Sequence, residues 1–413
     1  MKLRYKYRIY PTNSQEQQMI LVGGSVRFVY NYFLKSNIDQ YRPISTNIDQ
    51  YAIDKKFVWY FDMNKQLTQL KKQYIWLNET YSQVLQQSTK DLDQALKNIK
   101  HGAGFPHFKS KYTTPISFRY QQHVSIIDSK YVRLPKIGNI RIKMHRELPS
   151  NFTGCTISQT PRGWYISFIV GIDEKTLVDD ISKPVGIDLN SQNIALSNSE
   201  LIANPRPLKS AQPKVKKLQR NLSRKQKGSK NRGKAKNKLA RLHNKIKNQR
   251  LDHIHQTSAR IAKDHDLVSV ETLKIDQMRQ SNKYTAKAIA DAGWAMLINT
   301  LTYKCQLLGH HLIKINQWLP STKQCSGCQA KKKSMPLHIR IFICDKCGLI
   351  IHRDVNAAIN ICIWGYQQWL IKYGKTGQEL PNGPVDVIWD ILVNHNKITQ
   401  SQTKQEATCS LDT

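Results

Sequence analysis

Four cysteines toward the C-terminal end of the chain follow a C-x2-C-x15-C-x2-C spacing, formed by Cys325, Cys328, Cys344 and Cys347. Two residues between the cysteines of a pair let both thiolates turn toward one ion, and two such pairs complete a tetrahedron. A segment this short cannot build a hydrophobic core, so metal binding must supply its folding energy, about 10–16 kcal/mol in comparable peptides. Four sulfur ligands leave no open position, and the spacing therefore predicts one structural zinc ion. A redox C-x-x-C motif is the alternative, but it leaves the second pair unexplained.

Basic residues outnumber acidic ones by more than two to one in this 413-residue chain, with 64 Lys and Arg, 29 Asp and Glu and a formal net charge of +35. Such a field attracts a polyanion, most commonly nucleic acid, with an anionic membrane surface as the alternative. No apolar run approaches the roughly 18 residues of a spanning helix, and the first residues lack the apolar segment of a signal peptide. We therefore expect a soluble, cytoplasmic protein that binds nucleic acid and no membrane.

The hydrophobic periodicity divides the chain into parts. Residues 3–9 alternate as in a strand, residues from about 12 to 104 are mainly helical, and residues 106–182 alternate again. A β-rich body interrupted by a helical insertion is the simplest interpretation. From residue 184 onward, short apolar strands alternate with helical stretches, which is typical of an α/β domain.

Residues 201–250 contain 18 Lys and Arg and no Asp or Glu. Apolar residues recur at helical spacing within this segment, which predicts a basic helix pair over residues 205–262 rather than a disordered tail. A solvated helical face is the ordinary explanation of a charge run. The excess is better explained by neutralisation of phosphates with counterion release. The nucleic-acid contacts that we predict are Arg224, Lys225, Lys227, Lys230, Arg232, Lys234, Lys236, Lys238 and Arg241.

Three carboxylates stand where apolar segments begin or end. Asp188 ends the strand "PVGID", Glu271 ends the strand "LVSVE", and Asp354 precedes a helix predicted from about Asn356. Burying an unpaired charge costs several kcal/mol, and one or two shared Mg²⁺ ions would remove that cost. Each residue also has an ordinary explanation, such as a turn cap or an acid in the first turn of a helix.

Several motifs, in order, resemble those of the transposon-encoded TnpB (OrfB) proteins, relatives of the type V CRISPR effector nucleases. The resemblance covers residues 1 to about 373. The segments that carry it are "KYRIYPTNSQ", "GGSVRFVYNYFL", "FPHFKSK", "RLPKIGNIRI", "LSRKQKGSKNRGKAKNKLARLHNKI", "DAGWAMLINTLTYK", "PSTKQCSGC" and "HRDVNAAINI".

The resemblance implies an N-terminal β-barrel with a helical insertion, followed by an α/β RuvC (RNase H-like) domain with an inserted zinc ribbon. On this plan residues 1–183 are the barrel, for RNA and target-adjacent DNA recognition. Residues 184–318 and 349–372 are the nuclease domain, and residues 319–348 are the ribbon. Residues 373–413 form a partly disordered tail.

The activity that the resemblance implies is RNA-guided cleavage of DNA. Asp188, Glu271 and Asp354 match the three carboxylates with which the family binds its catalytic Mg²⁺. The guide RNA would come from the element's own end, and the target would be double-stranded DNA beside a short motif. The protein would act as a monomer in the cytoplasm of a prokaryotic cell, associated with the nucleoid when bound to DNA.

Three positions depart from the family's pattern. His352 stands where Asp is common, Gln329 replaces the glycine usual after the first pair of cysteines, and His107 replaces a common arginine. None of them is an inferred metal ligand.

Two other functions are compatible with the sequence. A nuclease-silent, RNA-guided DNA-binding repressor would be favoured by loss of one of the three acids, but all three are present. An RNase H-like DNA strand-transferase shares the core, but the ribbon between the second and third acids and the basic helix pair match the TnpB pattern.

Overall fold

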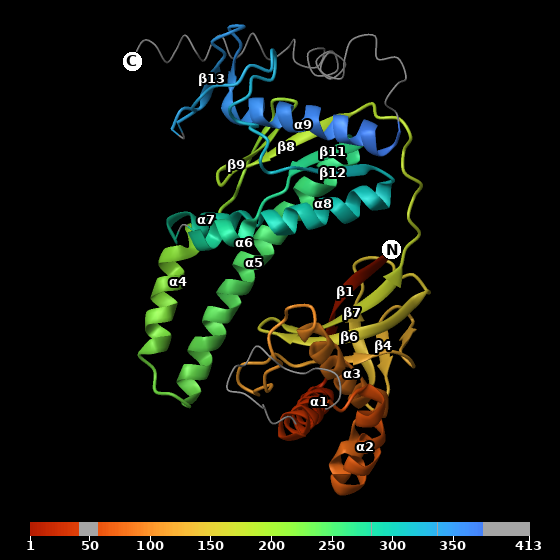
Figure 1. Ribbon diagram of the computed structural model, residues 1–413. Coiled ribbons are helices and arrows are strands. Elements are labelled where there is room, and N and C mark those ends of the chain that lie inside the picture. The colour runs from red at the N-terminus through yellow and green to blue at the C-terminus, as the bar shows by residue number, and fades with distance from the viewer. Residues whose placement is uncertain (41–56, 282, 337, 375–413) are drawn as a thin grey trace. The chain divides into compact units, whose positions relative to one another are not determined.

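The computed structural model describes residues 1–40, 57–281, 283–336 and 338–374 and divides into two compact units, Met1–Ile172 and Asp173–Thr413 (Figure 1). The predicted tail beyond residue 374 lies outside the described residues. No helix in the described ranges is both long enough and apolar enough to span a membrane.

The first unit consists of one antiparallel sheet and a group of helices. The strands follow the order β2-β6-β7-β1-β5-β4-β3, and the edge strands β2 and β3 are not paired with each other among the described residues. The predicted barrel is therefore an open, curled half-barrel. The elements are β1 (Lys2–Tyr10), α1 (Asn13–Gln40), α2 (Tyr60–Gln73), a 3-10 turn (Ile75–Glu79), α3 (Ser82–Ile99), β2 (Ser117–Tyr120), β3 (Ser125–Ile127), β4 (Tyr131–Leu134), β5 (Gly138–Lys143), β6 (Phe152–Thr160) and β7 (Gly163–Gly171).

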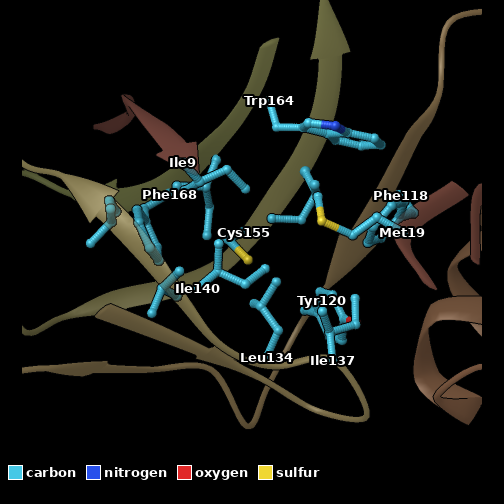
Figure 2. Packing of buried hydrophobic residues seen from close by; sticks show 14 of the residues in the cluster. Ile9, Met19, Phe118, Tyr120, Leu134, Ile137, Ile140, Cys155, Trp164 and Phe168 are labelled. Atoms are coloured by element: carbon cyan, nitrogen blue, oxygen red, sulfur yellow. The ribbon is translucent and has the colours of Figure 1, made fainter. Parts of the chain in front are cut away.

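Alternation along the strands builds the core of this sheet. In β1, Tyr7 and Ile9 are buried while the residues between and beside them face solvent. Figure 2 shows side chains from several strands, among them Ile140, Phe168 and Trp164, meeting in one layer. The helices form a second cluster of their own, which includes buried leucines from α2 and α3. The predicted β-rich body with a helical insertion thus has two adjoining cores.

The second unit contains a five-stranded sheet of order β10-β9-β8-β11-β12. Strands β8, β11 and β12 are parallel, and β9 and β10 run antiparallel to their neighbours. Its elements are β8 (Pro184–Leu189), β9 (Asn193–Leu196), β10 (Leu201–Ala203), α4 (Pro207–Ser223), α5 (Lys230–Asp264), β11 (Leu267–Glu271), α6 (Ile275–Ser281), α7 (Lys283–Ala292), α8 (Trp294–Leu308), β12 (His311–Ile315), β13 (Ile341–Ile343), β14 (Ile350–His352) and α9 (Arg353–Lys372).

Helices cover both faces of the five-stranded sheet (Figure 1). Ile254 and Ile261 of α5 and Leu301 of α8 pack with β8 and β11 in one cluster, whereas α9 packs on β11 and β12 in another. The sheet is thus buried on both sides, which explains why β8 and β11 read as continuous apolar runs.

Helix α9 lies close to the sheet because two positions at their contact, Gly186 and Gly365, are glycines. A Cβ atom on Gly186 of β8 would overlap the carbonyl oxygen of Ala358 and stand 2.5 Å from the backbone nitrogen of Cys362. A Cβ atom on Gly365 of α9 would overlap the Ser269 hydroxyl of β11. The two glycines therefore set the depth at which α9, and with it the acid in its first turn, rests against β8 and β11.

Substituting Gly186 by Ala should destabilise the second unit by about 3 kcal/mol, because the added methyl group meets backbone atoms that cannot rotate away. The matched control is Gly233→Ala in the exposed part of α5, where no atom lies within 4 Å of the new Cβ. That change should stabilise the helix by about 0.5–1 kcal/mol. Urea unfolding of both variants measures the difference, and equal midpoints would contradict the close approach.

Candidate metal centres

Two of the three predicted acids lie at the same edge of the sheet. Strands β8 and β11 are parallel neighbours, with Ile187 opposite Val270, so Asp188 and Glu271 follow at adjacent carboxyl ends. This edge is where open α/β sheets place their ligands. Asp354 lies in the first turn of α9, which contacts both strands. The fold therefore brings together carboxylates that are 83 and 166 residues apart in sequence, counted from Asp188.

The electrostatics of Asp188 report this crowding. Burial, together with the charges of Glu271 and Asp354, raises the pKa of Asp188 to about 8 against the opposing charge of Arg353. Burial also raises the pKa of Glu271, partly offset by a hydrogen bond that the Ser321 hydroxyl donates to its Oε1 atom at 2.5 Å. At neutral pH the metal-free edge therefore favours a retained proton, and a bound cation would remove that preference.

Asp354 is 2% exposed and is surrounded by donors. The Asn190 amide donates to its Oδ2 atom at 2.7 Å, and the guanidinium groups of Arg340 and Arg353 each lie 3.4 Å from one of its oxygens. The positive N-terminal end of α9 also favours a carboxylate there. These donors compensate the buried carboxylate of Asp354 for the water that it loses on folding.

The donor set at this edge suits a hard divalent cation. The oxygen atoms of three carboxylates are the kind of ligands that Mg²⁺ and Mn²⁺ prefer. Within the described ranges, the three acids do not form a group whose ligand atoms all lie within 4.8 Å of one another; only the four cysteines do. Asp188, Glu271 and Asp354 would hold such a cation after a shift that brings their oxygen atoms closer together.

The four predicted cysteine ligands meet at one point. Their sulfur atoms all lie within 4.8 Å of one another, with Cys325 and Cys347 3.7 Å apart and Cys328 and Cys344 3.5 Å apart. A backbone N–H of Cys347 lowers the pKa of the Cys344 thiol to about 6, whereas burial raises the pKa of the Cys325 thiol to about 12. Four thiolates this close need a cation, and the tetrahedral sulfur set fits zinc.

The first pair of cysteines is tied to α9 by two buried asparagines one turn apart. Asn356 donates to the Gln324 carbonyl oxygen at 2.7 Å and accepts from the Ser326 backbone N–H at 2.9 Å. Asn360 donates to the carbonyl oxygens of Ser321 and Gln324 at 2.8 and 2.7 Å. Since the Ser321 hydroxyl also bonds Glu271, this segment connects the cysteine cluster to the acid edge.

Two of the departures from the family pattern have a local explanation. The Asp354 backbone N–H donates to Nδ1 of His352 at 3.3 Å, so His352 is the N-cap of α9. Burial lowers the pKa of this imidazole, which keeps it neutral and able to accept. Gln329 has φ of 59°, a left-handed conformation that favours glycine and costs another residue about 1–2 kcal/mol. Its amide donates to the Ser326 carbonyl oxygen at 3.2 Å, which offsets part of that cost.

The basic segment forms the hairpin of α4 and α5 (Figure 1). Eight of the nine predicted contact residues are exposed, and Arg232 is half-buried. Arg232 donates to the carbonyl oxygens of Leu222 and Lys225, so it closes the turn of the hairpin. The buried carboxylate of Asp291 fixes the base of the hairpin, since it accepts from two backbone N–H groups at the start of α4 and pairs with Arg250 of α5 at 2.8 Å.

Sequence reasoning missed the side chains that support the acids, namely Asn190, Ser321, Arg340, Arg353, Asn356 and Asn360. It also placed the start of α9 near Asn356, whereas the helix begins at Arg353. Asn356 and Asn360 stand at i and i+4 in the otherwise apolar stretch 355–364 of α9, and this spacing could have indicated a shared polar partner. The other four carry no signal in a single sequence.

Raising the pH from about 5 to 8 without Mg²⁺ should destabilise the zinc-loaded protein relative to its Asp188→Asn variant. The pKa of Asp188 is about 8 in the folded state and 3.8 ordinarily. The folded chain thus keeps a proton that the unfolded chain has lost, and stability falls through this window. Thermal unfolding at several pH values measures the difference. Asp276→Asn, which alters an exposed acid, should follow the wild type, and a wild-type slope in Asp188→Asn would contradict the crowding.

Replacing Cys344 by Ser should remove the zinc ion and unfold the segment around it, because three sulfur ligands no longer complete the tetrahedron. Zinc content by mass spectrometry and limited proteolysis after residue 320 measure both effects. Asp345→Asn is the control, since this neighbour of Cys344 is exposed and its carboxylate forms an ion pair with Lys332. Full zinc content in Cys344→Ser would contradict the assignment.

Family models match three parts of the chain. A model described as "Probable transposase" (OrfB_IS605) matches residues 167–282, and one described as "Cas12f1-like, TNB domain" matches residues 294–361. A model described as "Helix-turn-helix domain" (HTH_OrfB_IS605) matches residues 1–43, where the described residues form β1 and α1.

Two relatives match nearly the whole chain. A "Putative RNA-guided DNA endonuclease" of Streptomyces pristinaespiralis is 33% identical over 373 residues, 88% of this chain and 90% of the relative. "Putative RNA-guided DNA endonuclease InsQ" of Escherichia coli (strain K12) is 30% identical over 406 residues, 93% of this chain and 98% of the relative. A solved chain in "Cryo-EM structure of the Cas12f1-sgRNA-target DNA complex" aligns with a TM-score of 0.34 at 15% identity, over 88% of this chain and 99% of that one. The predicted family is confirmed, and the chain belongs to the TnpB (OrfB) family.

Proposed function

We propose that this protein is an RNA-guided DNA endonuclease that cuts phosphodiester bonds with Mg²⁺ held by Asp188, Glu271 and Asp354. The observation that carries the proposal is the convergence of these acids from three distant segments on one sheet edge, where burial and the charges of Glu271 and Asp354 raise the pKa of Asp188 to about 8. A bound cation would offset the cost of ionising these buried acids, and perturbed carboxylates of this kind are typical of functional sites. The names of the two relatives support the choice of DNA as substrate and RNA as guide.

The proposed domain plan follows the family. The five-stranded sheet, with three parallel and two antiparallel strands and helices on both faces, supports a RuvC (RNase H-like) domain over residues 184–318 and 349–372. The cysteine cluster and the short β13–β14 pair support a zinc ribbon over residues 319–348. The curled half-barrel supports an RNA- and DNA-recognition domain over residues 1–183.

The residues at the acid edge have separable roles. Bound Mg²⁺ would polarise the phosphodiester and lower the pKa of the attacking water. The three carboxylates would hold the ions, and Ser321 and Asn190 orient two of those carboxylates. The side chain of Arg340 is 44% exposed beside Asp354, where its fixed positive charge can bind the phosphate of the substrate.

The exposed cations of the α4–α5 hairpin would contact the phosphates of the guide RNA or of its hybrid with the target strand. Such contacts read the shape of the backbone rather than its sequence. The guide would be transcribed from the element's own end, and the first unit would read the short motif beside the target. The protein would act as a monomer associated with the nucleoid.

Glu271→Gln should reduce cutting of a guide-matched DNA at least about 100-fold, because a neutral amide cannot replace a carboxylate ligand. Binding of RNA and DNA should remain at wild-type affinity, since Glu271 faces the metal site. The RNA that copurifies with the protein is sequenced first to design the substrate, and cutting is measured with and without Mg²⁺.

The matched control is Glu200→Gln, which removes an exposed carboxylate of the same unit that pairs with Arg260. It should cut like the wild type. If the wild type binds guide and target but never cuts, the protein is a nuclease-silent repressor. Retained cutting by Glu271→Gln would remove Glu271 from the metal site.

A further inference from the structure

Asn190 lies in the turn between β8 and β9, two residues after Asp188. Both the oxygen and the nitrogen of its side-chain amide form hydrogen bonds. The Oδ1 atom of Asn190 accepts the backbone N–H groups of Gln192 and Asn193, each at 2.8 Å. With its acceptor end occupied twice, only the amide nitrogen points outward. That nitrogen donates to Oδ2 of Asp354 at 2.7 Å, across 164 residues of sequence.

The orientation of this amide is determined by its neighbours. Exchanging the oxygen and nitrogen of Asn190 would set the amide hydrogens against two backbone N–H groups and the carbonyl oxygen against a carboxylate. Both ends would become repulsive. The network therefore permits one arrangement, in which a neutral donor faces Asp354.

The turn itself is braced by Asn204 and Arg206, which follow β10. The Asn204 amide donates to the carbonyl oxygen of Asn190 at 3.0 Å, and the Arg206 side chain donates to that of Ser191 at 3.1 Å. The backbone N–H of Asn204 donates to the Gln192 carbonyl oxygen at 2.8 Å. Because these hydrogen bonds restrict the backbone of the turn, they also restrict the position from which the Asn190 side chain contacts Asp354.

Asn190 makes the shortest of the side-chain contacts to Asp354. The two arginines lie at 3.4 Å, at the outer limit of a hydrogen bond, and a cation entering the site would compete with their charge. A neutral amide does not compete in this way. It occupies one lone pair of Oδ2 and restricts the rotation of the carboxyl group, which would orient the carboxylate toward a cation shared with Asp188.

We propose that Asn190 is a positioning residue that links two of the three carboxylates of the metal site, Asp188 and Asp354. It follows Asp188 on the same turn, and its amide donates a hydrogen bond to Asp354. This inference rests on the proposed function. It explains how an acid on a helix and an acid on a strand keep their separation before the ion arrives. Ligand-orienting groups of this kind are typically worth 10- to 100-fold in metal affinity.

The test measures Mn²⁺ binding to the zinc-loaded, full-length protein by electron paramagnetic resonance, and then cutting as a function of Mn²⁺ concentration. In Asn190→Ser the hydroxyl still accepts a backbone N–H in the turn but is too short to reach Asp354. We expect the Mn²⁺ dissociation constant to rise about 10- to 100-fold. Saturating Mn²⁺ should restore most of the cutting rate, because the ligands themselves remain.

The control is Asn204→Ser, which removes a brace from the same turn without touching either acid. Its Mn²⁺ affinity should stay within about threefold of the wild type, below the loss typical of a ligand-orienting group. An equal loss of Mn²⁺ affinity in both variants would show that Asn190 only maintains the turn, which would overturn the proposal. Wild-type Mn²⁺ affinity in Asn190→Ser would overturn it as well. Absence of Mn²⁺ binding in the wild type would instead contradict the proposed function itself.

Discussion

Burial of three acids at one edge of a sheet is the constraint around which the second unit is arranged. Asp188 and Glu271 end adjacent parallel strands, and α9 brings Asp354 to the same edge because Gly186 and Gly365 let the helix rest on backbone atoms. The free energy of this arrangement is unfavourable without a cation, as the raised pKa of Asp188 indicates. The fold tolerates it because buried apolar clusters on both faces of the sheet hold the strands and the helix in place. The fold thus accepts a loss of stability at an edge that a bound cation would stabilise.

The cysteine cluster extends this arrangement to a segment that has no core of its own. The buried cluster there consists mainly of Cys325, Cys344 and Phe342, so sulfur–metal bonds must replace hydrophobic burial. Yet the same segment supplies Ser321 to Glu271 and Arg340 to Asp354. A structural ion held by the four cysteines would therefore help to determine where these two groups lie, through the Asn356 and Asn360 hydrogen bonds that fasten the segment to α9. This arrangement accounts for the position of the cysteine motif directly before Asp354 in the sequence.

What could be predicted from the sequence was local or periodic. The cysteine spacing predicted the sulfur cluster, and apolar runs ending in an acid predicted that Asp188 and Glu271 close buried strands. The open half-barrel was not predictable from alternation, because whether β2 and β3 meet depends on twist accumulated over all seven strands. The Asn190–Asp354 contact was equally hidden, since it joins residues 164 positions apart and asparagine is common in turns. Domain boundaries came from the family resemblance rather than from periodicity, and they stay a prediction.

The departure at residue 352 follows from the same charge balance. The N-cap of α9 accepts the backbone N–H of Asp354, and Asp, the residue common in the family, would do so with a negative charge two residues from Asp354. His352 accepts the same N–H through Nδ1, and burial keeps its imidazole neutral. The cap is therefore kept without adding a fourth acid to an edge where Glu271 and Asp354 already raise the pKa of Asp188. A substitution that looks disruptive in the motif thus limits the negative charge at this edge, because the helix requires an acceptor at this position and not an anion.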